Sequence, residues 1–423
     1  MFVRANTQHA AGVPVSTMAA LMLAVFAVSI GYGVVLPLLP YLIERLSGPA
    51  ATAVQISRHT GLLTGVYAFA LFVFAPVWGR LSDRLGRRRV LLAGVIGFGV
   101  TMLAFSFVER LTAVYAERFL SGLFSAAVTP VAAAAIGDLV EEDVRGRRLA
   151  FLSMAGIAGF LLGPMLGVYS TRLAGAWLGE SKAIGSLTAP LIATAGLAFL
   201  VSAAVAISVP APGGHSEPKK VAGIPGDPSA WTVPILLLLT FVVSSAIGVF
   251  EVGLALRGKQ DLGLTSYQIA MMFTECSLIM FVIQGITFSP WVKPRSTRWL
   301  IAPALAMLAA GMFFVPRASD FTLMLIVIGA VAAGAGVLSP ILTYWISAKA
   351  GSAQGWELGK QTAASSLGMT LGSALGGLLF NIASVPGASF ILIAVLVVLG
   401  FLLSLWLPHL LVHPHYSKHA VTI

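Results

Sequence analysis

The chain has 423 residues, of which 58% are hydrophobic and only 10% are charged. Soluble domains carry about 25% charged residues, so this composition excludes a soluble protein and places most of the surface in lipid. The formal net charge of +10 comes from basic residues in short gaps between apolar runs, which favours a membrane surface rather than nucleic acid as the partner.

Apolar runs of membrane-spanning length follow one another along the chain. A hydrocarbon core of about 30 Å needs about 20 apolar residues per helix. About twelve such runs are present, at residues 16–43, 60–82, 89–108, 111–139, 148–172, 186–209, 231–256, 266–290, 298–316, 319–347, 358–380 and 387–408. The first lacks a cleavage site and is expected to be retained. The sequence therefore predicts an all-α membrane protein with twelve transmembrane helices.

A stretch rich in Pro and Gly, residues 209–230, interrupts this series after the sixth run. Such a composition is typical of a flexible linker. It predicts an N-terminal six-helix bundle over residues 1–208 and a C-terminal six-helix bundle with a short tail over residues 231–423. Six helices on each side of a linker suggest two pseudo-symmetric halves.

The loops differ in their content of Lys and Arg, which sets the orientation. If both termini are cytoplasmic, cytoplasmic segments hold 17 of the 26 basic residues and the opposite side holds eight. The most basic loop, "GRLSDRLGRRR" at residues 79–89, is then cytoplasmic. We expect an integral protein of a bacterial inner membrane.

The same loop resembles the signature loop of the major facilitator superfamily. The matching residues are Gly79, Asp83, Arg84, Gly86, Arg87 and Arg88. Three further stretches are similar to the drug–proton antiporters of that superfamily, including the tetracycline exporters: "LPLLPYL" at 36–42, "RFLSG" at 118–122 and "GFLLGPMLG" at 159–167. The last one matches the antiporter motif at Gly159, Gly163, Pro164 and Gly167, although Ala150 and Val168 stand where that motif has Gly. The resemblance implies two six-helix bundles and export by alternating access.

Physical chemistry gives the charged loop a role of its own. Gly79 and Gly86 allow tight turns and close helix approach. Arg84 and Arg88 are expected to pair with acids at the ends of neighbouring helices, with Asp138 as the first candidate. The resemblance implies that such pairs hold the outward-facing state. The alternative is that the arginines only fix topology.

Charges within apolar runs are costly, at about 2.5 to 3.5 kcal/mol each on insertion scales. Glu275 lies about nine residues into its run, hence about 13 Å deep, where transporters place ion sites. Burial favours the neutral form of such a carboxyl group, so it can take up and release a proton. Glu251 lies nearer a helix end. Arg118 matches the antiporter arginine that is associated with proton transfer, while its neighbour Glu117 is expected at the membrane interface. For each, a purely structural role is the alternative.

Polar and aromatic residues within apolar runs are candidates for binding an amphiphilic compound. The best of them are Tyr32, Tyr67, Phe250 and Gln284, of which Tyr32 and Gln284 lie on helices that line the cavity in the resembled family. Packing is the alternative role for each.

The sequence therefore predicts a proton-coupled exporter of a small amphiphilic compound, with protons and cargo as partners. No phosphate-binding loop and no hydrolase motif is present, so neither ATP-driven transport nor an enzyme is expected. We expect no cofactor, no metal site and a monomer. Helix 1 carries no acid before Glu44, whereas tetracycline exporters have an aspartate where Val28 stands. An importer or facilitator of a metabolite or iron chelate therefore stays open, as does a transport-inactive receptor or assembly factor.

Overall fold

The computed structural model describes residues 14–139, 142–178, 185–210, 231–287, 294–349, 354–382 and 384–411. All regular secondary structure within these ranges is helical. The all-α fold that the composition predicts is therefore confirmed.

The α-helices follow the predicted runs in order. They are α1 (Val15–Ser47), α2 (Ala53–Leu85), α3 (Arg87–Phe105), α4 (Leu111–Ser125), α5 (Thr129–Leu139), α6 (Glu142–Leu178), α7 (Gly185–Ser208), α8 (Thr232–Leu256), α9 (Ser266–Thr287), α10 (Ile301–Phe314), α11 (Phe321–Lys349), α12 (Gln354–Leu378), α13 (Ala388–Ser404) and α14 (Leu407–Leu410). A π-helical turn, Arg257–Asp261, extends α8, and short 3-10 turns, Pro294–Leu300 and Val315–Arg317, flank α10.

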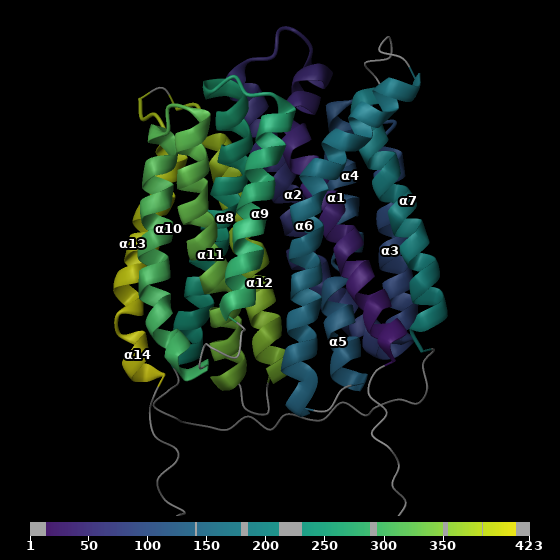
Figure 1. The fold of residues 1–423 in the computed structure, drawn as a ribbon, viewed down its shortest axis with the longest axis vertical. Helices are drawn as coiled ribbons and strands as arrows, with labels where there is room; N and C mark the ends of the chain where they lie inside the picture. The colour runs from purple at the N-terminus through teal and green to yellow at the C-terminus, as the bar shows by residue number, and fades with distance from the viewer. Residues whose placement is uncertain are drawn as a thin grey trace, which may run out of the picture.

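The described helices are consistent with twelve membrane crossings. Ten spans in the described residues are long and apolar enough to cross a bilayer, and the shorter apolar helix α13 and the Gly- and Ser-rich helix α12 complete the series. The predicted span 111–139 is one crossing made of α4 and α5, with a turn between them. In Figure 1, α1 begins and α14 ends at the lower end of the view, as an even number of crossings requires.

The ends of the molecule are named here as Figure 1 shows them. The lower end holds the start of α1 and the junction of α2 with α3, and the upper end holds the junction of α1 with α2. Helices before residue 210 lie on the right of the view and helices after residue 231 on the left. The main contacts between these two groups are those of α2 with α12 and of α6 with α9. The predicted domain boundaries stay a prediction, and residues 211–230 of the linker lie outside the described residues.

Several helices are longer than the apolar runs that predict them. Helix α2 begins at Ala53, seven residues before its predicted start. A capping box explains this start: the side chain of Thr52 accepts a hydrogen bond from the backbone N–H of Gln55, and the Gln55 side chain accepts one from the backbone N–H of Thr52. Apolar content marks the part of a helix in lipid, whereas caps mark where the helix begins.

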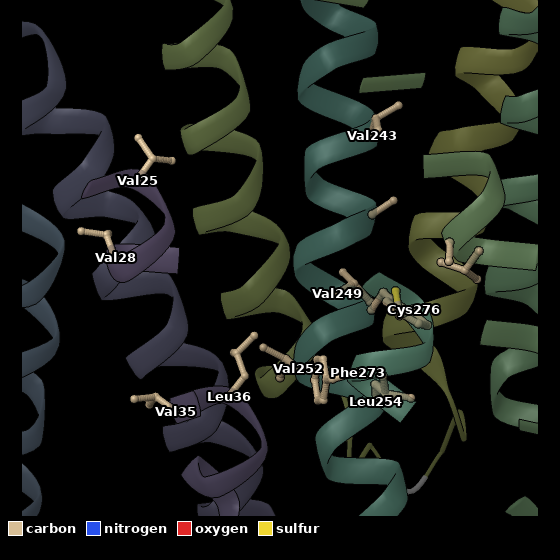
Figure 2. Close-up of a cluster of buried hydrophobic side chains, with 14 of the residues drawn as sticks. Val25, Val28, Val35, Leu36, Val243, Val249, Val252, Leu254, Phe273 and Cys276 are labelled. Carbon is tan, nitrogen blue, oxygen red and sulfur yellow. The ribbon is translucent and has the colours of Figure 1, made fainter. Parts of the chain in front are cut away.

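Apolar side chains fill the space between the helices around the centre. Figure 2 shows Leu36 of α1 and Val252 of α8 pointing toward each other, with Phe273 and Cys276 of α9 close by. All four side chains are buried. The two groups of helices therefore meet through a packed apolar layer, within which any polar group stands out.

Candidate functional site

A cavity of about 160 Å³ lies among α6, α8, α9 and α11, at the boundary between the two groups of helices. Its lining is mostly apolar and aromatic: Gly156, Ile157, Phe160, Ile247, Phe250, Glu251, Phe273, Cys276, Ser277, Met280, Val331, Ala332 and Ala335. Glu251 is the carboxylic acid in this lining. A mostly apolar cavity with a few polar groups is the usual form of a small-molecule site.

Glu251 is buried and is bonded across the boundary between the two groups of helices. Its side chain is 7% exposed, and its Oε2 accepts a hydrogen bond of 2.6 Å from the hydroxyl of Tyr32. Tyr32 lies on α1, 219 residues earlier in the chain, so this bond joins the two groups of helices. Glu251 lies near the end of α8 at Leu256, as the sequence predicts, and the chain continues as a π-helical turn beyond it.

Aromatic rings surround this hydrogen bond. The ring of Tyr32 stacks on Tyr67 of α2, with centroids 5.0 Å apart and planes 23° apart, and on Phe160 of α6 at 5.8 Å. Phe160 in turn meets Phe273 edge-on at 6.4 Å. Three predicted binding residues are therefore brought together near the cavity: Phe250 lines it, Tyr32 contacts its acid, and Tyr67 lies behind Tyr32.

Arg118 lies beside this cluster and is itself almost fully buried, with 2% of it exposed. Its guanidinium donates to both carboxylate oxygens of Glu117, with Nε–Oε2 at 2.7 Å and Nη2–Oε1 at 3.0 Å. It also lies over the ring of Tyr67, 5.5 Å from the centroid, and over that of Phe105. Glu117 is itself buried, and a buried guanidinium needs a counter-charge, which this neighbouring residue supplies. Its location at the membrane interface stays a prediction.

Glycines of the antiporter-like motif set the distance between α6 and α1. A Cβ atom added at Gly163 would lie 2.7 Å from the carbonyl oxygen of Ile30, and one at Gly159 would lie 2.4 Å from that of Phe26. At Gly167 the nearest atom would be 3.7 Å away, an ordinary contact. Pro164 packs against Gly33 of α1. The motif thus lets α6 lie directly on the backbone of α1, the helix that carries Tyr32.

The structure separates the remaining predicted residues from the cavity. Glu275 lies on the face of α9 that also bears Leu278 and Val282, which are 49% and 48% exposed, whereas Cys276 and Ser277 face the cavity. Glu275 is half-buried and is absent from the lining. Gln284 is buried on α9, one turn below the cavity residue Met280 and also outside the lining.

The charged loop forms a compact cluster at the lower end of the molecule. Arg87 contacts Asp83 at 2.6 Å and Asp138 of α5 at 2.8 Å, and Arg88 donates to the backbone carbonyl of Ala206 on α7. Asp138 is therefore the acidic partner, but its arginine is Arg87 rather than Arg84 or Arg88. Helix α3 begins at Arg87, and successive residues of a helix point about 100° apart. Arg87 therefore faces Asp138 on α5, whereas Arg88 faces α7.

The two glycines of this loop differ in what they do. Gly86 has a φ of 91°, a left-handed conformation that joins α2 to α3 and favours glycine. Gly79 lies within α2, and a Cβ atom there would meet no atom of the described residues within 4 Å. The close helix approach expected at Gly79 is therefore not found in the described part of the chain.

A second polar cluster lies at the upper end and joins the two groups of helices. Nζ of Lys259, in the π-helical turn, contacts Oε2 of Glu44 on α1 at 2.5 Å and lies over the ring of Tyr41. The Tyr41 hydroxyl donates to the carbonyl of Leu264 at 2.7 Å. Gln260 and Asn381 both donate to the carbonyl of Ala53 at the start of α2. We call this set the upper clamp: Tyr41, Glu44, Ala53, Lys259, Gln260, Leu264 and Asn381.

Sequence reasoning did not identify the upper clamp. Its members lie in or beside short connections, and the signal available was only that Glu44 and Lys259 are opposite charges expected on the same side of the membrane. Their contact depends on how the two groups of helices dock, which no local pattern encodes.

Comparisons with known proteins agree with this architecture. The profile of the Major Facilitator Superfamily matches residues 21–357. Multidrug resistance protein 1 of Bacillus subtilis (strain 168) is 25% identical over 374 residues, covering 86% of this chain and 90% of that protein. Quinolone resistance protein NorA of Staphylococcus aureus (strain COL) is 24% identical, covering 85% and 88%. A crystal structure of the human organic anion transporter MFSD10 (TETRAN) superposes with a TM-score of 0.70 at 20% identity, covering 92% and 99%, which shows a shared fold.

Proposed function

This chain belongs to the Major Facilitator Superfamily, and from this membership we propose that it exports a small amphiphilic compound in exchange for protons. It is an integral membrane transporter of small molecules, not an enzyme. The direction of transport, the coupling to protons and the bacterial inner membrane as its location are our proposal. The multidrug and quinolone resistance proteins that it resembles along most of its length support export.

One observation carries the coupling proposal: a carboxyl group, Glu251, is buried in the lining of the central cavity. A charged carboxylate is costly in apolar surroundings, so burial favours its protonated form, while the Tyr32 hydroxyl favours the charged form. These opposing influences allow the group to bind and release a proton. A proton and an amphiphilic cation cannot both occupy one carboxylate, which is the requirement for exchange.

The cycle follows from this competition. With Glu251 charged, the cavity takes up cargo from the cytoplasm. After the cavity opens to the outside, a proton from the medium neutralises Glu251 and releases the cargo. The neutral carrier then returns, and the proton leaves inside. We place Glu251, rather than Glu275, in this role because Glu251 lines the cavity. The guanidinium of Arg118 lies over the ring of Tyr67, which stacks on Tyr32, and we propose that its charge influences Glu251 through these rings.

Transport by purified protein in liposomes tests the proposal. The full chain is reconstituted with ethidium, a fluorescent amphiphilic cation, and ethidium movement is followed under an imposed pH gradient of either sign. We expect movement of ethidium against the direction of proton flow for the wild type and none driven by the gradient for Glu251→Gln. Glu109→Gln, an exposed acid far from the cavity, is the matched control and should transport as the wild type does.

The same assay separates the alternatives. Ethidium or a metabolite moving in the same direction as protons would show a symporter and overturn export. Unchanged gradient-driven transport in Glu251→Gln would remove this residue from the coupling role. No gradient-driven flux of any of a panel of drugs, siderophores and metabolites by the wild type would favour a receptor or assembly factor.

A further inference from the structure

We infer that Tyr32 is a positioning residue: its hydroxyl holds the empty Glu251 carboxylate and thereby prevents proton movement without cargo. This inference rests on the proposed function and gives Tyr32 a role other than the direct binding of substrate that its sequence context suggests. Cargo must displace the Tyr32 hydroxyl from Glu251 before the carrier can load.

The hydroxyl of Tyr32 is an internal ligand of Glu251. It donates to Glu251 at 2.6 Å, from α1 to α8, across the boundary between the two groups of helices. Around Glu251 the cavity is lined by apolar groups such as Ile247 and Phe250. A carboxylate in such surroundings is strongly disfavoured without a donor. Tyr32 supplies that donor when no cargo is present.

The ring of Tyr32 is held so that its hydroxyl can reach only a small region. Tyr67 and Phe160 both stack on it. The backbone of α1 on either side of it is fixed by close approach of α6, since a Cβ atom at Gly159 or Gly163 would overlap that backbone. A ring packed in this way loses little conformational freedom when its hydroxyl binds, so the bond to Glu251 forms at low entropic cost.

Loading must break this bond. A cargo that reaches the carboxylate replaces the Tyr32 hydroxyl and removes a polar link between α1 and α8. Without cargo the hydroxyl stays bonded to the charged carboxylate, and this link between α1 and α8 keeps the empty carrier from changing conformation. If the hydroxyl is removed, this link is lost and the empty carrier with a charged carboxylate can also reorient. Together with the return of the protonated carrier, each round trip then carries a proton without cargo, which is a leak through the coupling site.

Other ionisable groups lie around the Tyr32–Glu251 pair or beside its neighbours, and they affect any measurement made as a function of pH. They come from α2, α4 and α9, and they are Tyr67, Glu117, Arg118, Glu275 and Cys276. In the lining contributed by α6 and α11 the side chains carry no charge. A leak that depends on Glu251 is therefore shown by a double variant, not by its pH profile alone.

Proton entry into liposomes without any cargo is the direct test. Purified full-length protein is reconstituted with the pH dye pyranine inside, and a pH gradient is imposed. We expect Tyr32→Phe, which keeps the ring, to leak protons several-fold faster than the wild type. Adding Glu251→Gln to Tyr32→Phe should return the leak to the level of Glu251→Gln alone. Tyr115→Phe is the matched control, since the Tyr115 hydroxyl bonds His59 on α2 instead.

Two results of this assay would overturn the inference. The first is a Tyr32→Phe leak equal to that of the wild type. The second is a leak that persists in the double variant, because it would then arise from general damage to packing.

A spectroscopic measurement keeps the inference testable if the proposed function fails. Spin labels at Ala19 of α1 and Leu238 of α8, both exposed near the lower end, report the distance between these helices in a Cys276→Ala background. We expect Tyr32→Phe to shift the distance distribution of the cargo-free protein as Glu251→Gln does. Identical distributions for Tyr32→Phe and the wild type would sink the positioning role whether or not the protein exports ethidium.

Discussion

At the scale of single residues, two glycines one helical turn apart on α6 offer a sharp comparison. A Cβ atom at Gly163 would lie 2.7 Å from a carbonyl oxygen of α1, whereas one at Gly167 would meet its nearest atom at 3.7 Å. We predict that Gly163→Ala lowers the stability of the protein by about 1–3 kcal/mol, the usual cost of overpacking a tight contact. Gly167→Ala should be neutral or slightly stabilising because it improves helix propensity.

Thermal unfolding of the purified variants, followed by tryptophan fluorescence, checks this pair. Equal melting temperatures for the two alanine variants would contradict the claim that the motif acts by close approach of α6 to α1. A loss of stability confined to Gly163→Ala would explain the motif physically, without any contact to cargo.

The position of a residue along its helix could be predicted from the sequence, but the direction in which its side chain points within the bundle could not. The sequence places Glu275 deep in its run and Glu251 nearer a helix end, and both lie within membrane helices. Which one faces the cavity depends on how α8 and α9 are rotated in the packed bundle. Similarly, Glu117 and Arg118 are adjacent, and only their shared burial against Tyr67 and Phe105 forces them to pair.

At the scale of helices, the upper clamp closes one end of the molecule. The side chain of Lys259 is 11% exposed and that of Glu44 is 54% exposed, so their ion pair is partly desolvated. We predict that Lys259→Glu or Glu44→Lys separates α1 from the end of α8 and opens the upper end. An exposed pair contributes up to about 1 kcal/mol, which changes a two-state equilibrium about fivefold.

Labelling of a buried cysteine measures that opening. Ser57 is buried between α2 and α12 near the clamp, so Ser57→Cys in a Cys276→Ala background should react slowly with an impermeant maleimide. Either charge reversal should raise the rate several-fold, and the double variant Glu44→Lys/Lys259→Glu should restore it. A double variant as reactive as the single ones would mean that the ion pair does not hold the clamp.

Helices themselves were largely predictable because lipid demands long apolar runs, but their ends and breaks were not. The turn between α4 and α5 lies inside one predicted run, and although Ser125, Thr129 and Pro130 flank it, such residues also occur within unbroken helices, as Pro164 does in α6. The π-helical turn after α8 begins at Arg257, at the end of a predicted run, and carries Lys259 toward α1. Tertiary contacts select such irregularities, so local sequence cannot locate them.

At the scale of the whole molecule, the proposed orientation decides what each end does. The excess of Lys and Arg predicts that the lower end, with Arg80 and Arg87, faces the cytoplasm. The upper clamp then lies on the outer side and joins the two groups of helices there. With the opposite orientation the same clamp would lie on the cytoplasmic side.

Cysteine labelling in intact cells tests this orientation directly. Arg80→Cys at the lower end and Ala50→Cys at the upper end are both exposed positions, and a Cys276→Ala background removes the native thiol. We expect an impermeant maleimide to label Ala50→Cys in intact cells and Arg80→Cys only after permeabilisation. The reverse pattern would place the clamp inside the cell, and the proton that releases cargo would then have to come from the cytoplasm, which is incompatible with export driven by proton entry.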